Sequence, residues 1–247
     1  MLKMLPHKRG EQSMIVTHCR ICGGTDFVYQ PVLWPELISD WQLSAKEAEY
    51  IDHQQGKRCT HCGANLRSIA LACALTSSLP STPSHPAATE LLANWVQHPS
   101  RQTLSLLEIN EAGTLSPYLR QLPLHQLGQY PELDLCALAL PDASFDAVVH
   151  SDTLEHIPNP VKALQECYRV LKPGGVLCMT TPLVVGRMTR SRFGLPPSYH
   201  SPDKAPDYIV HTEFGADAWT SLMDAGFSHI SMHAVEYPAA LAFCAYK

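Results

Sequence analysis

Four cysteines near the start of the chain have the spacing of a metal site. Cys19 and Cys22 precede two glycines, and Cys59 and Cys62 precede one. Each Cys-x-x-Cys pair places two thiolates on a tight turn, and the glycine lets the backbone fold beneath a metal. Four thiolates suit tetrahedral Zn²⁺, and a site closed by four protein ligands leaves no position for a reactive water. The sequence therefore predicts a structural zinc site on these four residues.

Other interpretations of these cysteines stay open. The pairs could form two disulfides or a redox pair, and His18, His53 or His61 could serve as a ligand. The other five of the nine cysteines lie in apolar segments. An odd total without a disulfide pattern fits a reducing compartment, so we expect a cytoplasmic protein.

A second group of chemically capable residues follows an apolar run in the middle of the chain. Residues 145–150 have the apolar pattern of a buried strand. This strand is followed directly by polar residues: Ser151, Asp152, Glu155 and His156. In open α/β sheets, ligands bind beyond the carboxyl ends of the strands. His156 is the stronger general-base candidate because imidazole titrates near neutral pH. Alternatively, Glu155 and His156 only brace the loop.

The elements that position these residues can be placed from local signals. Ser44 and Glu47 form a capping-box pattern, Gly56 can end the helix that they begin, and Asn159 with Pro160 suits another helix start. Residues 77–89 are rich in Ser, Pro and Thr, which predicts a zinc-binding module over 1–76, a linker over 77–89 and a second domain over 90–247. The expected strands are 103–109, 145–150, 176–181, 227–235 and 241–246, and the expected helices are 45–55, 64–76, 90–98, 160–171 and 216–225.

The segments LPDASFDAVV, LEHI and RVLKPGG, between residues 140 and 175, resemble the second half of class I S-adenosylmethionine-dependent methyltransferases, close to the type 11 group. The resemblance extends from about Leu104 to the C-terminus. It implies a Rossmann-like α/β fold, with a mostly parallel seven-stranded sheet that ends in an antiparallel pair. The cysteine pairs add a small zinc-ribbon-like module, and the expected cofactors are S-adenosylmethionine and structural zinc.

The resemblance also implies a cofactor loop after the first strand. In the family an acidic residue is followed by alternating glycines. Here Glu108 takes the acidic position, Asn110, Ala112 and Thr114 stand where glycine is usual, and Gly113 is the only glycine. Asn tolerates the positive φ that such a turn requires.

Further cofactor contacts are implied downstream. Gln129 aligns with the acid that holds the ribose hydroxyls, with Glu132 as the alternative. Asp134 and Leu135 would flank the adenine, although Asp134 could instead cap a turn. The expected cofactor-binding set is Glu108, Asn110, Ala112, Gly113, Gln129, Asp134, Leu135, Ser151 and Asp152.

The long segment from Leu183 to Glu213 lacks clear periodicity. Such loops are usually functional or disordered, and this one follows the fifth strand, so we expect it to cover the acceptor. Three arginines within six residues favour an anionic acceptor, unless the loop is merely solvated. The expected acceptor-binding set is Glu155, Arg187, Arg190, Arg192 and Tyr199, and the candidate bases are His156, His200 and His211.

Composition restricts the function. The chain has 247 residues and a formal net charge of −5, which disfavours nucleic acid as the partner, and no apolar run is long enough to cross a bilayer. The arrangement is similar to bacterial methyltransferases of sugar and glycan biosynthesis. We therefore expect an enzyme of the EC 2.1.1 class that methylates a small, anionic sugar or glycan-type acceptor. The alternative is a methyltransferase-like binding or scaffold protein whose degenerate glycine motif no longer supports turnover.

Overall fold

The computed structural model describes residues 15–81, 90–201 and 203–247. Residues 82–89 of the expected linker lie outside this part of the chain. In the ranges that the structure describes, no helix combines the length and the apolar character that crossing a membrane requires.

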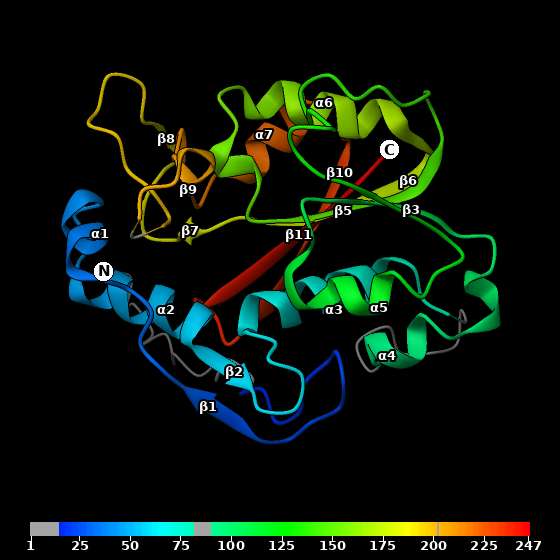
Figure 1. Cartoon of the computed structure of the whole chain (residues 1–247), viewed down its shortest axis with the longest axis horizontal. Coiled ribbons are helices and arrows are strands. Elements are labelled where there is room, and N and C mark those ends of the chain that lie inside the picture. The colour runs from blue at the N-terminus through cyan, green and yellow to red at the C-terminus, as the bar shows by residue number, and fades with distance from the viewer. Residues whose placement is uncertain (1–14, 82–89, 202) are drawn as a thin grey trace, which may run out of the picture.

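A six-stranded sheet forms the centre of the molecule (Figure 1). Its strands are β3 (Ser105–Ile109), β4 (Leu124–Gly128), β5 (Phe145–Ser151), β6 (Leu171–Thr180), β10 (His229–Val235) and β11 (Ala240–Tyr246). The spatial order is β10-β11-β6-β5-β3-β4, and β6, β5, β3 and β4 run parallel. β11 pairs antiparallel with β6 and with β10, which confirms the Rossmann-like arrangement and its antiparallel C-terminal pair.

The expected seventh strand is absent from the described residues. Residues 129–144, between β4 and β5, form turns and unpaired segments instead. Pro131 and Pro141 lie in this stretch, and proline cannot donate a hydrogen bond to a strand ladder. As a result β4 is the edge strand of the sheet, and it is partly exposed.

Helices cover both faces of the sheet. One face carries α6 (Pro160–Val170) and α7 (Trp219–Asp224), which share a core cluster with Leu107 and Val148. Asn159 caps α6 by accepting a hydrogen bond from the Lys162 backbone N–H at 3.1 Å, as its sequence signal indicated. In Figure 1 these two helices lie above the sheet.

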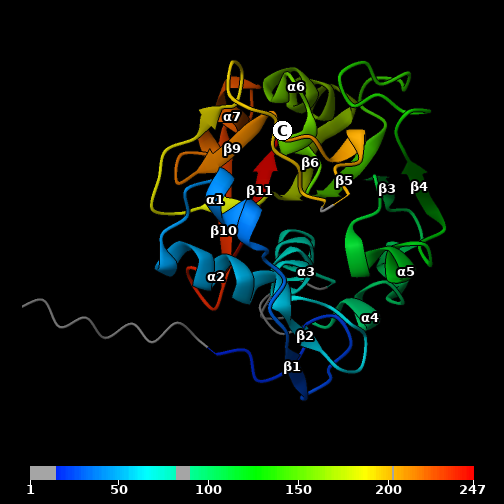
Figure 2. The same ribbon diagram turned by 60° about the vertical axis from the view of Figure 1, so that its left-hand side comes forward.

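The opposite face is covered from the N-terminal part of the chain. α3 (Leu66–Ser78) packs against β6, β10 and β11 (Figure 2), and its apolar side chains share one cluster with Leu106, Val149 and Ala242. The short helices α4 (Leu92–Trp95) and α5 (Ser116–Leu119) complete this side. A boundary at residue 76 stays a prediction, but α3 joins the cysteine-bearing part and the sheet in one core.

The remaining N-terminal elements form a small layer beside α3. They are β1 (Phe27–Tyr29), α1 (Pro35–Asp40), α2 (Ala45–Gly56) and β2 (Lys57–Cys59). β1 and β2 pair antiparallel, as in a zinc-ribbon-like hairpin, with both helices inserted between them. Both hydrogen bonds of the expected capping box form: Ser44 Oγ accepts from the Glu47 N–H, and Glu47 accepts from the Ser44 N–H at 2.8 Å.

The segment expected to cover the acceptor has a small sheet of its own. β7 (Leu183–Val184), β8 (Arg190–Ser191) and β9 (Thr212–Gly215) pair in the order β7-β9-β8. Local periodicity did not predict these strands because two of them have only two residues. Leu37 and Trp41 of the N-terminal layer form a third apolar cluster with Val184 and Val210, so α1 lies against this insert (Figure 2).

An ion pair also joins α2 to the insert. Arg187 Nε lies 2.7 Å from Glu47 Oε1, and both side chains are largely shielded from solvent. Arg187 also donates to the backbone oxygens of Trp41 at 2.7 Å and Gln42 at 2.6 Å. Hydrogen bonding from Arg187 lowers the pKa of Glu47 to about 2, although burial alone raises it.

We predict that Glu47→Gln lowers the free energy of unfolding at pH 7 by about 1.5–3 kcal/mol, the usual range for a charge-assisted hydrogen bond. Glu47 has a lowered pKa, so its contribution is complete above the ordinary carboxyl value of 4.5 and is lost as the pH falls through about 2. Chemical denaturation from pH 7 to pH 2 measures this. The exposed neighbour, through Glu49→Gln, is the control, and a wild-type advantage that persists unchanged at pH 2 would contradict the assignment.

Candidate functional site

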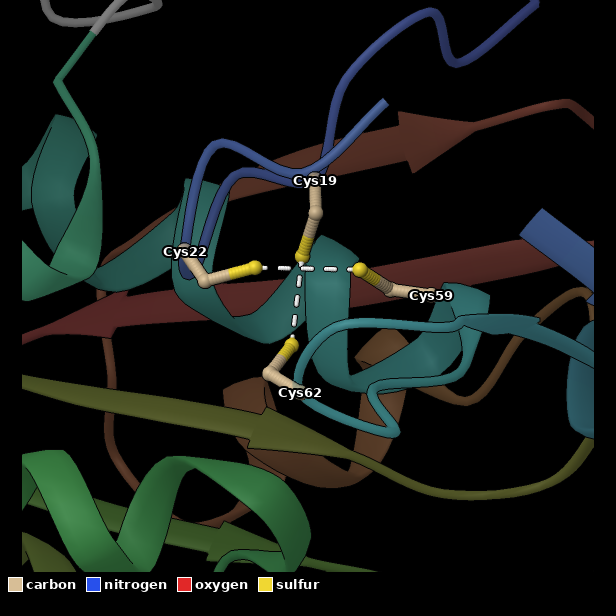
Figure 3. A group of neighbouring side chains, drawn as sticks. All are labelled: Cys19, Cys22, Cys59 and Cys62. Carbon is tan, nitrogen blue, oxygen red and sulfur yellow. Dashed lines mark hydrogen bonds between the residues drawn. The ribbon is translucent and has the colours of Figure 1, made fainter. Parts of the chain in front are cut away.

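The four paired cysteines converge on one point (Figure 3). Cys19 Sγ lies 3.6 Å from Cys62 Sγ, and Cys22 Sγ lies 3.7 Å from Cys59 Sγ. All four sulfurs lie within 4.8 Å of one another, and all four are free thiols, which excludes the disulfide interpretation for this structure. The group has the donor set and spacing of a four-thiolate metal site.

Both cysteine turns have the same backbone geometry. Gly23 and Gly63 have φ values of +83° and +76°, in the left-handed region that favours glycine. The Gly23 N–H donates to the Cys19 oxygen at 2.8 Å, and the Gly63 N–H donates to the Cys59 oxygen at 2.9 Å. The glycine after each second cysteine therefore closes the turn, as the sequence indicated.

The three histidines considered as alternative ligands do not belong to the sulfur cluster. His18 Nε2 lies 3.0 Å from Arg20 Nη1, and His53 Nε2 lies 2.7 Å from Glu236 Oε2. His61 lies beside the cluster at the tip of its turn without contributing a ligand atom.

A polar cavity of about 310 Å³ lies at the carboxyl ends of β3 and β5. Gly113 and Thr114 line it from the loop after β3, and Ser151 and Asp152 line it from the end of β5. Glu111 of the same loop also lines it, and the rest of the wall comes from the cysteine-bearing part of the chain, through Arg58, Gly63, Asn65, Arg67 and Ser68. Of the expected cofactor set, Gly113, Ser151 and Asp152 are therefore brought together here.

Glu108 and Ala112 support this cavity from beneath. The Glu108 carboxylate is fully buried, and it accepts hydrogen bonds from the Ala112 N–H at 2.7 Å and from Ser116 Oγ. Its second oxygen lies 2.7 Å from His125 Nε2. Burial alone would raise the pKa of Glu108, but these hydrogen bonds lower it by a larger amount. The net shift of the pKa is therefore downward, and the carboxylate stays charged. Glu108 thus shapes the loop that lines the cavity.

The loop after β3 leaves the cavity open despite its few glycines. Asn110 has a φ of +54°, and its side-chain oxygen accepts a hydrogen bond from the Tyr130 N–H at 2.9 Å, away from the cavity. Gly113 has a φ of +57°, and a Cβ at that position would lie 3.3 Å from Ser68 Oγ. The one retained glycine therefore stands where α3 approaches most closely.

Besides Glu108, Asn110 and Ala112, three more of the expected cofactor residues do not line this cavity. Gln129 is exposed, and Leu135 is buried in the core beside α6. Asp134 Oδ1 accepts a hydrogen bond from the Cys136 N–H at 2.8 Å, which is the turn-capping alternative. Their contacts with a cofactor stay predictions.

A second cavity of about 290 Å³ adjoins the first and shares Arg58, Arg67 and Asp152 with it. Its walls are largely apolar and come from Trp34 and Trp41 of the N-terminal layer, among others, and from the segment after β6. His156 and His200 line its polar end together with Asp152.

Arg67 and Asp152 form an ion pair between the two cavities. An Arg67 Nη2 hydrogen bond to Gln55 at 3.0 Å helps to fix the guanidinium. Burial lowers the pKa of Arg67 to about 10, so it stays charged at neutral pH. Arg67 Nη1 and Asp152 Oδ1 are buried without a hydrogen-bond partner among the described residues. A ligand with complementary polar groups would satisfy both atoms.

Glu155 lies between two histidines at the polar end of the second cavity. Its Oε1 is 3.5 Å from His156 Nε2 and 3.6 Å from His200 Nδ1. Burial raises the pKa of Glu155, but the nearby imidazoles outweigh it and hold the carboxyl ionised. The insert supplies His200, so it does reach the sheet edge. The backbone N–H of His211 donates to the backbone oxygen of Glu155 at 2.8 Å. The His211 side chain does not line either cavity.

Each arginine of the insert forms an ion pair within the chain. Arg187 pairs with Glu47, and Arg190 and Arg192 both pair with Glu213. Tyr199 forms an isolated bridge with Ile209. None of the three arginines lines either cavity, so their charges give no reason to expect an anionic acceptor.

Sequence reasoning missed the residues that the N-terminal part contributes. Arg67 opens an otherwise apolar helix, and a lone charge on such a helix could have signalled a buried ionic role. Trp34, Leu37 and Trp41 follow the i, i+3, i+7 spacing of one helix face, which requires an apolar partner. No local signal shows that this partner is the insert.

Comparisons with known proteins agree with this geometry. Residues 112–179 match a family model described as a methyltransferase domain. A probable S-adenosylmethionine-dependent methyltransferase of Mycobacterium tuberculosis is 35% identical over 115 residues, which are 44% of this chain and 38% of that protein. A ubiquinone biosynthesis O-methyltransferase of Pseudomonas putida is 33% identical over 81 residues, 32% of this chain and 34% of that protein.

A further relative is a probable S-adenosylmethionine-dependent methyltransferase of Mycolicibacterium smegmatis, 43% identical over 63 residues, 24% of each chain. The matched region thus spans about a quarter to two fifths of the curated relatives' own length. A solved methyltransferase of Thermotoga maritima aligns at 17% identity and a TM-score of 0.37, over 58% of this chain and 82% of that one. The sequence matches and the sheet order support a class I S-adenosylmethionine-dependent methyltransferase domain in this part of the chain.

Proposed function

We propose that this chain transfers a methyl group from S-adenosylmethionine to a small acceptor. The observation that carries the proposal is the pair of adjoining cavities at the sheet edge, one polar and one largely apolar, which share Arg67 and Asp152. Methyl transfer from a sulfonium is an in-line displacement in which the cofactor supplies the activated group. The protein must align donor and acceptor and exclude water, and two cavities with a common wall suit that task.

The polar cavity suits the donor. S-adenosylmethionine carries a carboxylate, an ammonium and a sulfonium in its amino acid part. Arg67 Nη1 offers an unpartnered donor to the carboxylate, and Asp152 Oδ1 offers an unpartnered acceptor to a cationic group. The loop after β3 lies close enough for backbone contacts with the ligand.

The apolar cavity suits the acceptor. Trp34, Leu37 and Trp41 line it, and it has no unpaired arginine from the insert. We therefore propose an acceptor with an aromatic or apolar body in place of the anionic sugar or glycan expected from sequence. The ubiquinone biosynthesis O-methyltransferases among the relatives support an acceptor of this kind. His156 and His200 line the polar end where the acceptor's reacting group would lie, and either imidazole could take its proton.

We also propose that the four thiols bind Zn²⁺. The sulfurs form a closed donor set in which Cys19 and Cys59 are buried and Cys22 and Cys62 are half-buried, and thiolates select zinc over hard metal ions. The metal would be structural and would fix the start of α3, which lies four residues after Cys62.

The donor site can be tested by calorimetry. Wild-type protein should bind S-adenosylhomocysteine, and Asp152→Asn should weaken binding by about tenfold or more, because it removes a charge at the shared wall. The exposed Asp142, through Asp142→Asn, is the matched control and should leave the affinity unchanged. Thermal melting confirms that each variant folds. No binding by wild type at millimolar ligand would instead favour the binding or scaffold alternative.

The acceptor class can be tested with a substrate panel. We expect transfer of labelled methyl from S-adenosylmethionine to hydroxylated aromatic compounds in preference to sugar phosphates. Trp34→Ala should lower kcat/KM by about tenfold or more through lost apolar contact. Trp219→Ala, at an exposed position of α7 outside both cavities, should leave kcat/KM unchanged. Preference for sugar phosphates with wild-type rates in Trp34→Ala would overturn the acceptor proposal but not the donor proposal.

The metal can be tested by elemental analysis. Cys62→Ser should lose one zinc per chain and lower Tm by about 10 °C or more, because binding of structural zinc contributes directly to folding. Cys136→Ser, remote from the sulfur cluster, should retain the full zinc content. Unchanged zinc content in Cys62→Ser would exclude this site.

A further inference from the structure

Glu155, His156 and His200 present three converging ligand atoms outside the sulfur cluster. Each offers one atom, and the three atoms lie within 4.8 Å of one another. They come from two distant parts of the chain, because the loop after β5 carries Glu155 and His156, and the insert carries His200. The fold, and not local sequence, assembles the group.

The spacing of these atoms fits coordination better than hydrogen bonding. Distances of 3.5 Å and 3.6 Å from Glu155 Oε1 to the two ring nitrogens exceed ordinary N–H···O bonds. A tetrahedral ion with bonds of about 2.1 Å separates its ligand atoms by about 3.4 Å. The two measured edges are close to that value without any rearrangement.

The carboxylate is built to point one oxygen at this position. Glu155 is 1% exposed, and its Oε2 accepts a hydrogen bond from Thr181 Oγ1 at 3.0 Å. Its Oε1 has no hydrogen-bond partner among the described residues. A buried, unpartnered carboxylate oxygen is costly, and a cation would remove that cost.

The imidazole of His156 is oriented in the same sense. His156 Nδ1 lies 2.8 Å from the Ile209 backbone oxygen, which accepts its N–H and leaves the Nε2 lone pair facing Glu155. Metal-binding histidines are held in this way by a backbone carbonyl or a carboxylate. The nearest cationic side chain, Arg67, is already paired with Asp152. His150, buried nearby on β5, has no hydrogen-bond partner for either ring nitrogen in the part of the chain that the structure describes, and it adds no charge in its neutral form.

We propose that Glu155 Oε1, His156 Nε2 and His200 Nδ1 bind a divalent first-row transition metal ion at the polar end of the apolar cavity. Two imidazoles and one carboxylate form a three-ligand set that leaves coordination positions open. His156 and His200 line the cavity, so the open positions face the space assigned to the acceptor. This role for the ion rests on the proposed function: a bound ion would make an acceptor hydroxyl more acidic, so that it releases its proton to solvent water. Its oxygen would then form the new O–C bond as the C–S bond of the sulfonium breaks and S-adenosylhomocysteine leaves. Metal binding itself does not depend on methyl transfer.

Cobalt titration tests the site without any assay of activity. Full-length protein carrying one zinc per chain is titrated with Co²⁺ and followed by visible absorption. We expect a second metal equivalent with visible d–d bands and without the near-ultraviolet charge-transfer bands that cobalt in a four-thiolate site produces. His200→Ala and Glu155→Gln should each weaken this second equivalent by about 100-fold or more, while the zinc content of the sulfur cluster stays at one.

Two further variants complete the test. Thr181→Val keeps all three ligands and removes only the bond to Glu155 Oε2, so it should weaken cobalt binding by about 10–100-fold even if Glu155→Gln does not fold. His229→Ala, at an exposed position on β10, is the control and should bind cobalt like wild type. The proposal is overturned if wild type takes up only the metal of the sulfur cluster, or if His200→Ala binds the second equivalent as tightly as wild type. In either case S-adenosylhomocysteine binding can remain intact, and the proposed function then stands without a second metal.

Discussion

The largely shielded ion pair between Arg67 and Asp152 joins the two halves of the site. Arg67 belongs to α3, which starts just after the sulfur cluster, and Asp152 follows the strand at the centre of the sheet. The pair is shielded from solvent, so loss of either partner would leave a charge uncompensated in a low-dielectric position. The cysteine-bearing part of the chain is therefore placed as a wall of both cavities, and not as a separate appendage.

This arrangement gives the sulfur cluster a role at the site. The sheet alone exposes an open edge, as Rossmann-like sheets do, and the loop after β3 carries only one glycine with which to approach a ligand. α3 and the residues before it close that edge from the other side. A metal that fixes the two cysteine turns would also fix the position of Arg58 and Arg67, which flank the second turn in sequence.

Local signals predicted much of the fold. The capping box at Ser44, the Asn159–Pro160 helix start and the apolar run of β5 each depend on residues close in sequence, and each is present as expected. The two cysteine turns could be predicted from the sequence for the same reason. The prediction of a seventh strand was wrong. It came from the family resemblance, whereas residues 129–144 carry two prolines and a capped turn.

The candidate site was harder to predict because it is assembled over long distances. The three insert arginines suggested an anionic acceptor. Their actual partners are distant in sequence: Glu47 lies on α2, and Glu213 lies on a neighbouring strand of the small sheet. His200 could not be linked to Glu155 from sequence because the insert brings it there, and the apolar face of α1 packs on the same insert.

In the proposed arrangement, a donor bound at the sheet edge contacts both halves of the chain. A crystal structure with S-adenosylhomocysteine tests it most directly: the account predicts ligand density in the polar cavity, with the amino acid part against Arg67 or Arg58. Density held by the sheet loops alone, with α3 displaced, would contradict it.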